Sequence, residues 1–168
     1  LSSAGRSLQL AARIPTSLDG CRALGIDVAA WAERGLVDWL AASPFLTTDF
    51  AMPLAEMRRA MGGRPLPLYA AMDFGHGPQN HSPESLRAAA LGLYGSGADG
   101  IYLFNQPCWI EYLAARPYHW LPDLATPESA ARKPLLFSLS HRLHRVPGVD
   151  LPWQLPADLD SGAELVLT

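Results

Sequence analysis

Polar side chains stand where several apolar stretches of this chain end. Arg13, Asp73 and Asn105 each lie at or near the end of such a run. If the runs are parallel strands, the three side chains lie at the carboxyl ends of the strands, where α/β proteins collect their chemistry. A carboxyl group there can act as acid, base or nucleophile, a guanidinium can orient it, and an amide can both donate and accept hydrogen bonds.

Asp73 is the main catalytic candidate, because a polar loop containing His76 and His81 follows it. The structural alternative for Asp73 is a loop cap or a salt bridge to Arg13. Arg13 is costly to place at the end of an apolar strand unless it pairs with an acid. The residue types alone leave structural pairing and function open for both.

Three other aspartates are separated by their position relative to the apolar runs. Asp49 lies in a polar loop after the run 36–42, so we expect it at the site, although an Asx turn is the structural alternative. Asp38 and Asp99 lie at the N-terminal ends of their strands, a face that serves stability, and we exclude both from the site.

Other familiar chemistries are not indicated by the motifs. The chain has no HxH or HExxH pattern, no GxSxG and no CxxC, so we expect no metal, no cofactor and neither a serine nor a thiol hydrolase. Cys21 and Cys108 are interpreted as core or near-surface thiols.

The elements that must position these residues alternate along residues 8–105. Predicted strands at 8–14, 36–42, 66–72 and 101–104 are separated by predicted helices, one beginning at Ser17 and others at 28–34, at 53–61 and from Ser82 to Gly95. Asp27 and Ser82 are the predicted N-caps of the helices that follow them. The strand starts repeat at roughly thirty residues, the size of one βα unit. This pattern predicts an α/β fold with a parallel sheet and right-handed crossovers.

Four βα units are half of an eightfold barrel or most of an open doubly wound sheet. No GxGxxG and no GxxxxGK[ST] follows a strand, which removes the main reason to prefer a nucleotide-binding open sheet. The last predicted strand, 101–104, is apolar throughout, as in a strand buried on both faces.

After Asn105 the pattern changes. A short helix is predicted at 108–113 and another at 123–131, with Thr126 as its cap. Prolines then recur between short β-prone stretches. We therefore predict two units: residues 1–132 as a partial barrel, and 133–168 as a linker with the first strands of a β module.

Composition limits the classes of partner. The 168 residues are 49% hydrophobic and 17% charged, with a net charge of −3 and no block of basic residues. A globular chain of this kind is not expected to bind nucleic acid. It contains no apolar run long enough to span a membrane.

A resemblance to a known family rests on segments spread along nearly the whole chain. They are ARIP at 12–15, CR at 21–22, GIDV at 25–28, Trp31, GLVD at 35–38, GADGIYLFN at 97–105, PDL at 122–124 and LP at 151–152 and 155–156. The early segments and GADGIYLFN resemble the later strands of a bacterial glycosyl-hydrolase-like (β/α)8 barrel family. The late segments resemble its exit into a C-terminal β-sandwich.

This resemblance implies the C-terminal half of a (β/α)8 barrel, strands five to eight, that cleaves O-glycosidic bonds of a poly- or oligosaccharide. Glycoside hydrolysis uses two carboxyl groups. Asp73 is the candidate supplied here, as acid or nucleophile, although related enzymes commonly carry Glu at this place. The second carboxylate is expected outside this chain, so we expect the 168 residues alone to be inactive.

The same resemblance implies contacts to the sugar from the polar and aromatic residues near Asp73. These are Arg13, Asp49, His76, Asn105 and Trp109. The alternative is a non-catalytic carbohydrate-binding protein on a degenerate barrel that uses the same residues. An aldolase or lyase is disfavoured because Lys133 lies beyond the barrel. The sugar, the linkage, the localisation and the oligomeric state stay open.

Overall fold

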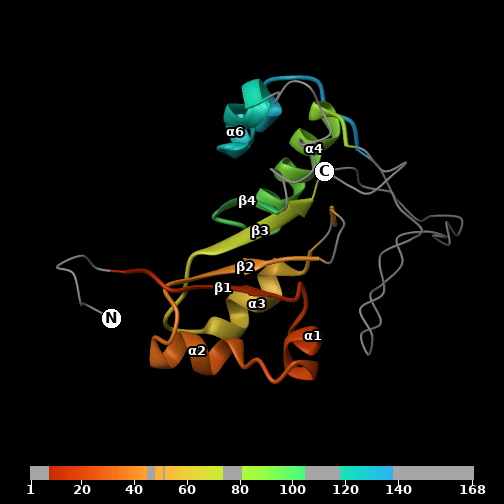
Figure 1. Cartoon of the computed structure of the whole chain (residues 1–168). Coiled ribbons are helices and arrows are strands. Elements are labelled where there is room, and N and C mark those ends of the chain that lie inside the picture. Colours follow the sequence, from red (N-terminus) through yellow and green to blue (C-terminus); the bar gives the residue numbers. More distant parts are fainter. Residues whose placement is uncertain (1–7, 45–47, 51, 74–80, 105–117, 138–168) are drawn as a thin grey trace, which may run out of the picture.

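The computed structural model describes residues 8–44, 48–50, 52–73, 81–104 and 118–137 (Figure 1). Its strands are β1 (Ala11–Ile14), β2 (Trp39–Ala42), β3 (Leu68–Asp73) and β4 (Gly100–Phe104). Its helices are α1 (Leu18–Ala23), α2 (Val28–Arg34), α3 (Leu54–Met61), α4 (Pro83–Gly95), the 3-10 helix η2 (Tyr118–Leu124) and α6 (Pro127–Ala131). The predicted alternation of strands and helices is confirmed.

The four strands form one parallel sheet in the order β1-β2-β3-β4. Each strand therefore pairs with the strand that follows it in the chain, and each connection contains at least one helix. Three strands begin later than the sequence predicts. β1 starts at Ala11, β2 at Trp39 and β3 at Leu68, and the predicted strand residues before them (8–10, 36–38 and 66–67) lie outside the strands.

One face of the sheet packs against the helices. Side chains alternate between the two faces of a strand, and the residues that reach the helix side are Ile14, Leu40, Ala42, Leu68, Ala70 and Met72. They form one buried cluster with residues of helices α1, α2, α3 and α4. These include Cys21, Val28, Ala32, Leu54, Met57, Leu86, Ala90 and Leu93. Figure 1 shows α1, α2 and α3 below β1 and β2, and α4 beside β3 and β4. The hydrophobic core thus lies between this face and the helices.

The opposite face carries the residues in alternate register. Trp39, Tyr69 and Tyr102 lie there, with ring centroids 5.2 Å apart for Trp39–Tyr69 and 6.4 Å for Trp39–Tyr102. Residues Ile101–Phe104 are only partly buried, so the prediction of a strand buried on both faces is wrong for the described residues. The reason is that β4 is an edge strand of the described sheet and has described helices on one face only.

The helix boundaries follow the predicted caps. Ser82 accepts the N–H of Ser85 at 3.3 Å, and Asp27 accepts that of Ala30 at 2.9 Å. Gly35 ends α2 with φ of 61°, a left-handed conformation that suits glycine. The helix predicted over 123–131 starts only at Pro127, because Thr126 caps it and 118–124 form η2 instead.

The two aspartates excluded from the site hold the N-terminal edge of the sheet. Asp38 accepts the N–H of Leu10 at 2.6 Å, and Asp99 accepts the N–H of Leu68 at 2.8 Å. Each carboxylate thereby satisfies a backbone donor of the neighbouring strand. Asp99 also pairs with Arg58 at 2.6 Å. Their placement at the edge away from the strand C-termini agrees with the sequence analysis.

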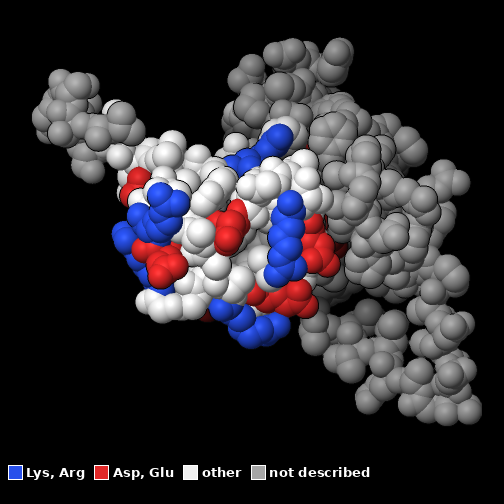
Figure 2. All heavy atoms as spheres, turned by 90° about the horizontal axis from the view of Figure 1, so that it is seen from below, with Lys and Arg blue, Asp and Glu red and all other residues white. Residues whose placement is uncertain are grey.

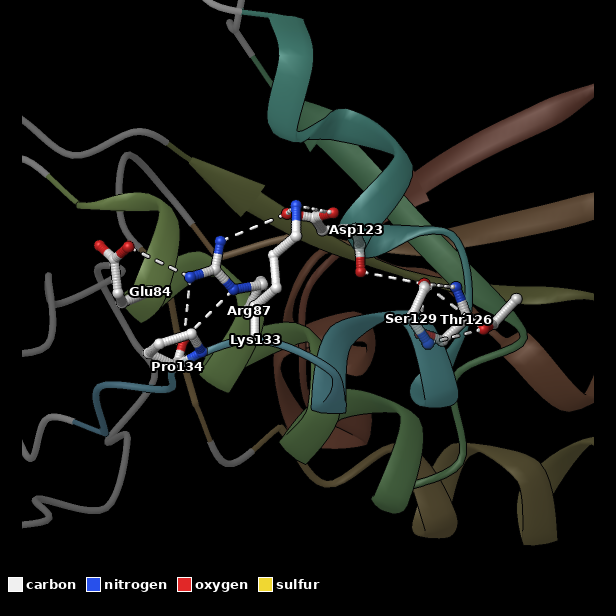
Figure 3. Close-up of polar contacts among 7 residues, drawn as sticks. All are labelled: Glu84, Arg87, Asp123, Thr126, Ser129, Lys133 and Pro134. Carbon is white, nitrogen blue, oxygen red and sulfur yellow. Dashed lines mark hydrogen bonds and ion pairs between the residues drawn. The ribbon is translucent and has the colours of Figure 1, made fainter.

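An ionic network around the buried Arg87 connects η2 and the residues after α6 to α4 (Figure 3). The Arg87 side chain is 5% exposed and donates to Asp123 at 3.3 Å, to Glu84 at 3.1 Å and to the carbonyl of Pro134 at 2.8 Å. Lys133 binds both carboxylate oxygens of Asp123, at 2.8 and 2.9 Å. Lys133 is therefore tied to η2 through Asp123, and Pro134 is hydrogen-bonded to α4 through Arg87. The predicted β module lies almost wholly outside the described residues and stays a prediction.

The helical side of the sheet carries mixed surface charges and the buried Cys21, as expected for a side with a structural role. Figure 2 shows acidic and basic side chains interspersed on the face seen from below. Among the described residues, no helix has the length and apolar character needed to cross a bilayer. Burial raises the pKa of Cys21 to about 11, so this thiol is a core residue, as expected. Cys108 lies outside the described residues.

Position 100 needs a glycine because the ring of Tyr69 lies where a side chain would begin. A Cβ at this position would stand 2.6 Å from Cε1 of Tyr69, whose ring also packs on Trp39. Gly100→Ala is expected to lower the free energy of unfolding by about 1–3 kcal/mol, since the packed ring must shift. Gly95→Ala is the matched control, because its Cβ meets nothing within 4 Å. Urea denaturation of both variants tests this, and equal stability of the two would contradict it.

Candidate functional site

Asp73 is the last residue of β3, and its side chain lies on the face away from the helices. The preceding residue, Met72, points into the helix-packed core, and its register partner in β4 is Leu103. Asp73 pairs in register with Phe104. It is only 2% exposed, yet neither carboxylate oxygen has a hydrogen-bond partner among the described residues. Buried polar groups without partners are rare in proteins, so this one needs an explanation.

Thr48 fixes the backbone of Asp73. Its hydroxyl donates to the Asp73 carbonyl at 2.6 Å and accepts the Asp73 N–H at 3.0 Å. Thr48 is itself buried and follows β2, the strand beside β3. The loop after β2 is therefore tied to the end of β3, and the carboxyl group is held in place while its oxygens are left without a partner.

His81 lies close enough to Asp73 to be affected by its charge. Burial lowers the pKa of His81 below its ordinary value, and the negative charge of Asp73 opposes that shift only in part. The imidazole also packs against Phe50, with centroids 5.9 Å apart. His81 is therefore neutral near pH 7.

His81 is hydrogen-bonded to the first turn of α4. Its Nδ1 lies 3.2 Å from the hydroxyl oxygen of Ser85, and the tautomer of the ring decides which of the two groups donates. The same hydroxyl lies 3.0 Å from the Ser82 carbonyl. A neutral imidazole has one unprotonated nitrogen in either tautomer and can accept a proton, so the end of β3 combines a carboxyl group with a nearby base.

Arg13 does not form the salt bridge with Asp73 that the sequence left open. Its guanidinium carbon lies 3.9 Å from the ring centroid of Phe104, and the residue is exposed rather than buried. No carboxylate pairs with it among the described residues. The argument from the cost of burying Arg13 was therefore wrong, because this side chain is exposed and its charge reaches solvent.

The other predicted site residues divide by position. Asp49 is 8% exposed and directly follows Thr48, so it lies in the loop tied to the end of β3. His76, Asn105 and Trp109 lie outside the described residues. Within the described part of the chain, no group of three or more potential metal ligands occurs.

Sequence reasoning missed three contributors to this site. Thr48 and Phe104 were not among the candidates, and of the two histidines after Asp73 only His76 was proposed as a sugar contact. His81 could have been found from its place directly before the helix cap Ser82, since the start of α4 lies at the same end of the sheet as the end of β3. The pairing of Thr48 with a backbone 25 residues away left no sequence signal.

Comparison with known proteins does not add to this description. No protein-family model matches the chain, and no match was found among curated proteins. The site is therefore interpreted from its own geometry.

The hydroxyl of Thr48 can be tested by a near-isosteric change. Thr48→Val leaves both backbone groups of Asp73 buried without this partner, so we expect a loss of about 1–3 kcal/mol in the free energy of unfolding. Thr48→Ser keeps the hydroxyl and should retain most of that stability. Chemical denaturation measures both. A Val variant as stable as the Ser variant would show that the hydrogen bonds contribute nothing.

The lowered pKa of His81 predicts a pH dependence of stability. The unfolded chain binds a proton near the ordinary value of 6.5, whereas the folded protein does so only at lower pH. Its stabilising contribution is therefore complete above pH 6.5 and is lost as the pH falls through the folded pKa. His81→Asn keeps an N–H donor toward Ser85 but cannot be protonated. Its free energy of unfolding, measured by urea denaturation between pH 7.5 and 5, should therefore lack the part of the pH dependence that His81 contributes. If the free energy of unfolding changes with pH equally in the variant and the wild type, this prediction is wrong.

Proposed function

We propose that the four described strands are strands five to eight of a (β/α)8 barrel. Two observations support this. The strands pair in sequential order with helices α1–α4 packed against the same face, as in a singly wound barrel rather than a doubly wound sheet. Arg13 of β1 also contacts Phe104 of β4, although two strands lie between them, and this contact favours a sheet that curves toward that face.

We further propose that the protein hydrolyses O-glycosidic bonds of a poly- or oligosaccharide, with Asp73 as one of its two carboxylates. The observation that carries this proposal is the Asp73 carboxyl group, buried at the carboxyl end of a parallel strand with both oxygens unpartnered. Carboxyl ends of barrel strands supply catalytic residues. A sugar oxygen would provide the missing partner.

The proposed mechanism divides the work between two carboxyl groups. In glycoside hydrolysis one protonates the leaving oxygen, while the other attacks the sugar or activates water. Asp73 takes one of these roles, and Thr48 holds its backbone so that little motion is needed. The second carboxylate would come from a strand outside this chain.

Non-catalytic carbohydrate binding is the second candidate. It is favoured by the aromatic rings of Trp39, Tyr69 and Tyr102 on the same face as Asp73, because aromatic faces stack on sugars. In that case the carboxylate of Asp73 would only accept hydrogen bonds from sugar hydroxyls.

The variant Asp73→Asn separates the two candidates in the full-length protein. It preserves shape and removes the titratable group, so the turnover number should fall at least about a hundredfold while the saccharide still binds. Hydrolysis of an oligosaccharide panel and calorimetric binding provide the two measurements. The Thr48→Ser variant, which keeps the hydroxyl that positions Asp73, serves as the control with near-normal turnover. An Asn variant that hydrolyses at the wild-type rate would refute a catalytic role, and a wild type that binds without turnover would favour the second candidate.

A further inference from the structure

We propose that the saccharide recognised at this site is acidic, and that Arg13 binds its carboxylate. The inference deepens the proposed function and rests on it. It starts from a charged side chain on the same sheet face as Asp73 that has no acidic partner among the described residues.

Three arginines on the described helices provide a contrast. Arg22, Arg58 and Arg87 each form an ion pair with an aspartate, at 2.7, 2.6 and 3.3 Å. Arg13 instead lies over the ring of Phe104, with its guanidinium carbon 3.9 Å from the centroid. Arg34 of α2 and Arg59 of α3 also have no ion pair among the described residues, so what distinguishes Arg13 is its place on the sheet face that carries Asp73.

Stacking leaves the binding edge of the guanidinium available. A guanidinium that lies on an aromatic face keeps its N–H groups in the plane parallel to the ring. The planar fork matches a carboxylate, which accepts two parallel hydrogen bonds. Phe104 therefore holds the group in a fixed orientation, so less side-chain entropy is lost when an anion binds.

Charge decides between a neutral and an acidic sugar. A saccharide that covers Arg13 removes water from the guanidinium, and a charged group taken out of water without a counter-charge is costly. A neutral sugar supplies only hydroxyl groups, whereas the carboxylate of a hexuronic acid supplies the counter-charge. The exposed position of Arg13 means that the free protein does not bear this cost.

The spacing is compatible with one saccharide that reaches both groups. Asp73 and Phe104 are register partners on adjacent strands, about 4.8 Å apart across the sheet. Arg13 therefore contacts the ring of the residue that pairs in register with Asp73, which brings the guanidinium to the end of β4 beside the end of β3. A sugar whose glycosidic oxygen meets Asp73 would bring a carboxylate on the same or the next ring to Arg13.

The test measures binding in the Asp73→Asn background of the full-length protein, so that turnover does not interfere. The probes are trisaccharides of galacturonate and of glucuronate, each compared with its carboxyl-reduced neutral counterpart by calorimetry. The acidic member of at least one pair should bind at least about tenfold more tightly, the range expected for a charge-assisted bidentate contact. Arg13→Gln should abolish that preference, while Arg13→Lys, which keeps the charge but not the fork, should retain only part of it.

The outcomes are distinguishable from failure of the proposed function. If neutral and acidic probes bind equally, or if the preference survives in Arg13→Gln, the inference is overturned even when wild-type protein hydrolyses sugars. Absence of binding to every acidic probe also overturns it. Thermal melts confirm folding of the variants, and Arg13→Lys gives a usable result should Arg13→Gln not fold.

Discussion

The register of β3 against the helix-packed face is the constraint on which this structure depends. Met72 and Ala70 must face the core that α1–α4 cover, and Asp73, one residue further, must then face the other way. A shift of one residue would bury the carboxyl group among the helices and expose Met72. Hydrophobic packing on one side of the sheet thereby determines the chemistry that is available on the other side.

The two sides of the sheet differ in their charged groups. On the helical side Arg87 pairs with Asp123 and Glu84, and Arg58 pairs with Asp99. On the opposite face Arg13 lies on Phe104, and the oxygens of Asp73 have no partner among the described residues. Native proteins rarely leave buried polar groups unsatisfied, so the Asp73 carboxyl group is the feature of this face that most needs an explanation.

The sequence predicted the parts of the fold that depend on local signals. The caps at Asp27 and Ser82 gave the starts of α2 and α4, and the period of the apolar runs gave the parallel order of the strands. The environment of Arg13 was not predictable, because it depends on how far the sheet curves and on Phe104, 91 positions along the chain. The tie between Thr48 and Asp73 was missed for the same reason, since such contacts between distant residues leave no trace in periodicity or spacing.

The central claim is that the Asp73 carboxyl group is left unpartnered in order to meet a sugar. A crystal structure of the full-length protein with a bound oligosaccharide tests this most directly. The account predicts a sugar oxygen within about 2.6–3.2 Å of a carboxylate oxygen of Asp73, on the sheet face that faces away from α1–α4. A saccharide bound elsewhere, with the carboxyl group of Asp73 hydrogen-bonded to the protein's own donors, would contradict it.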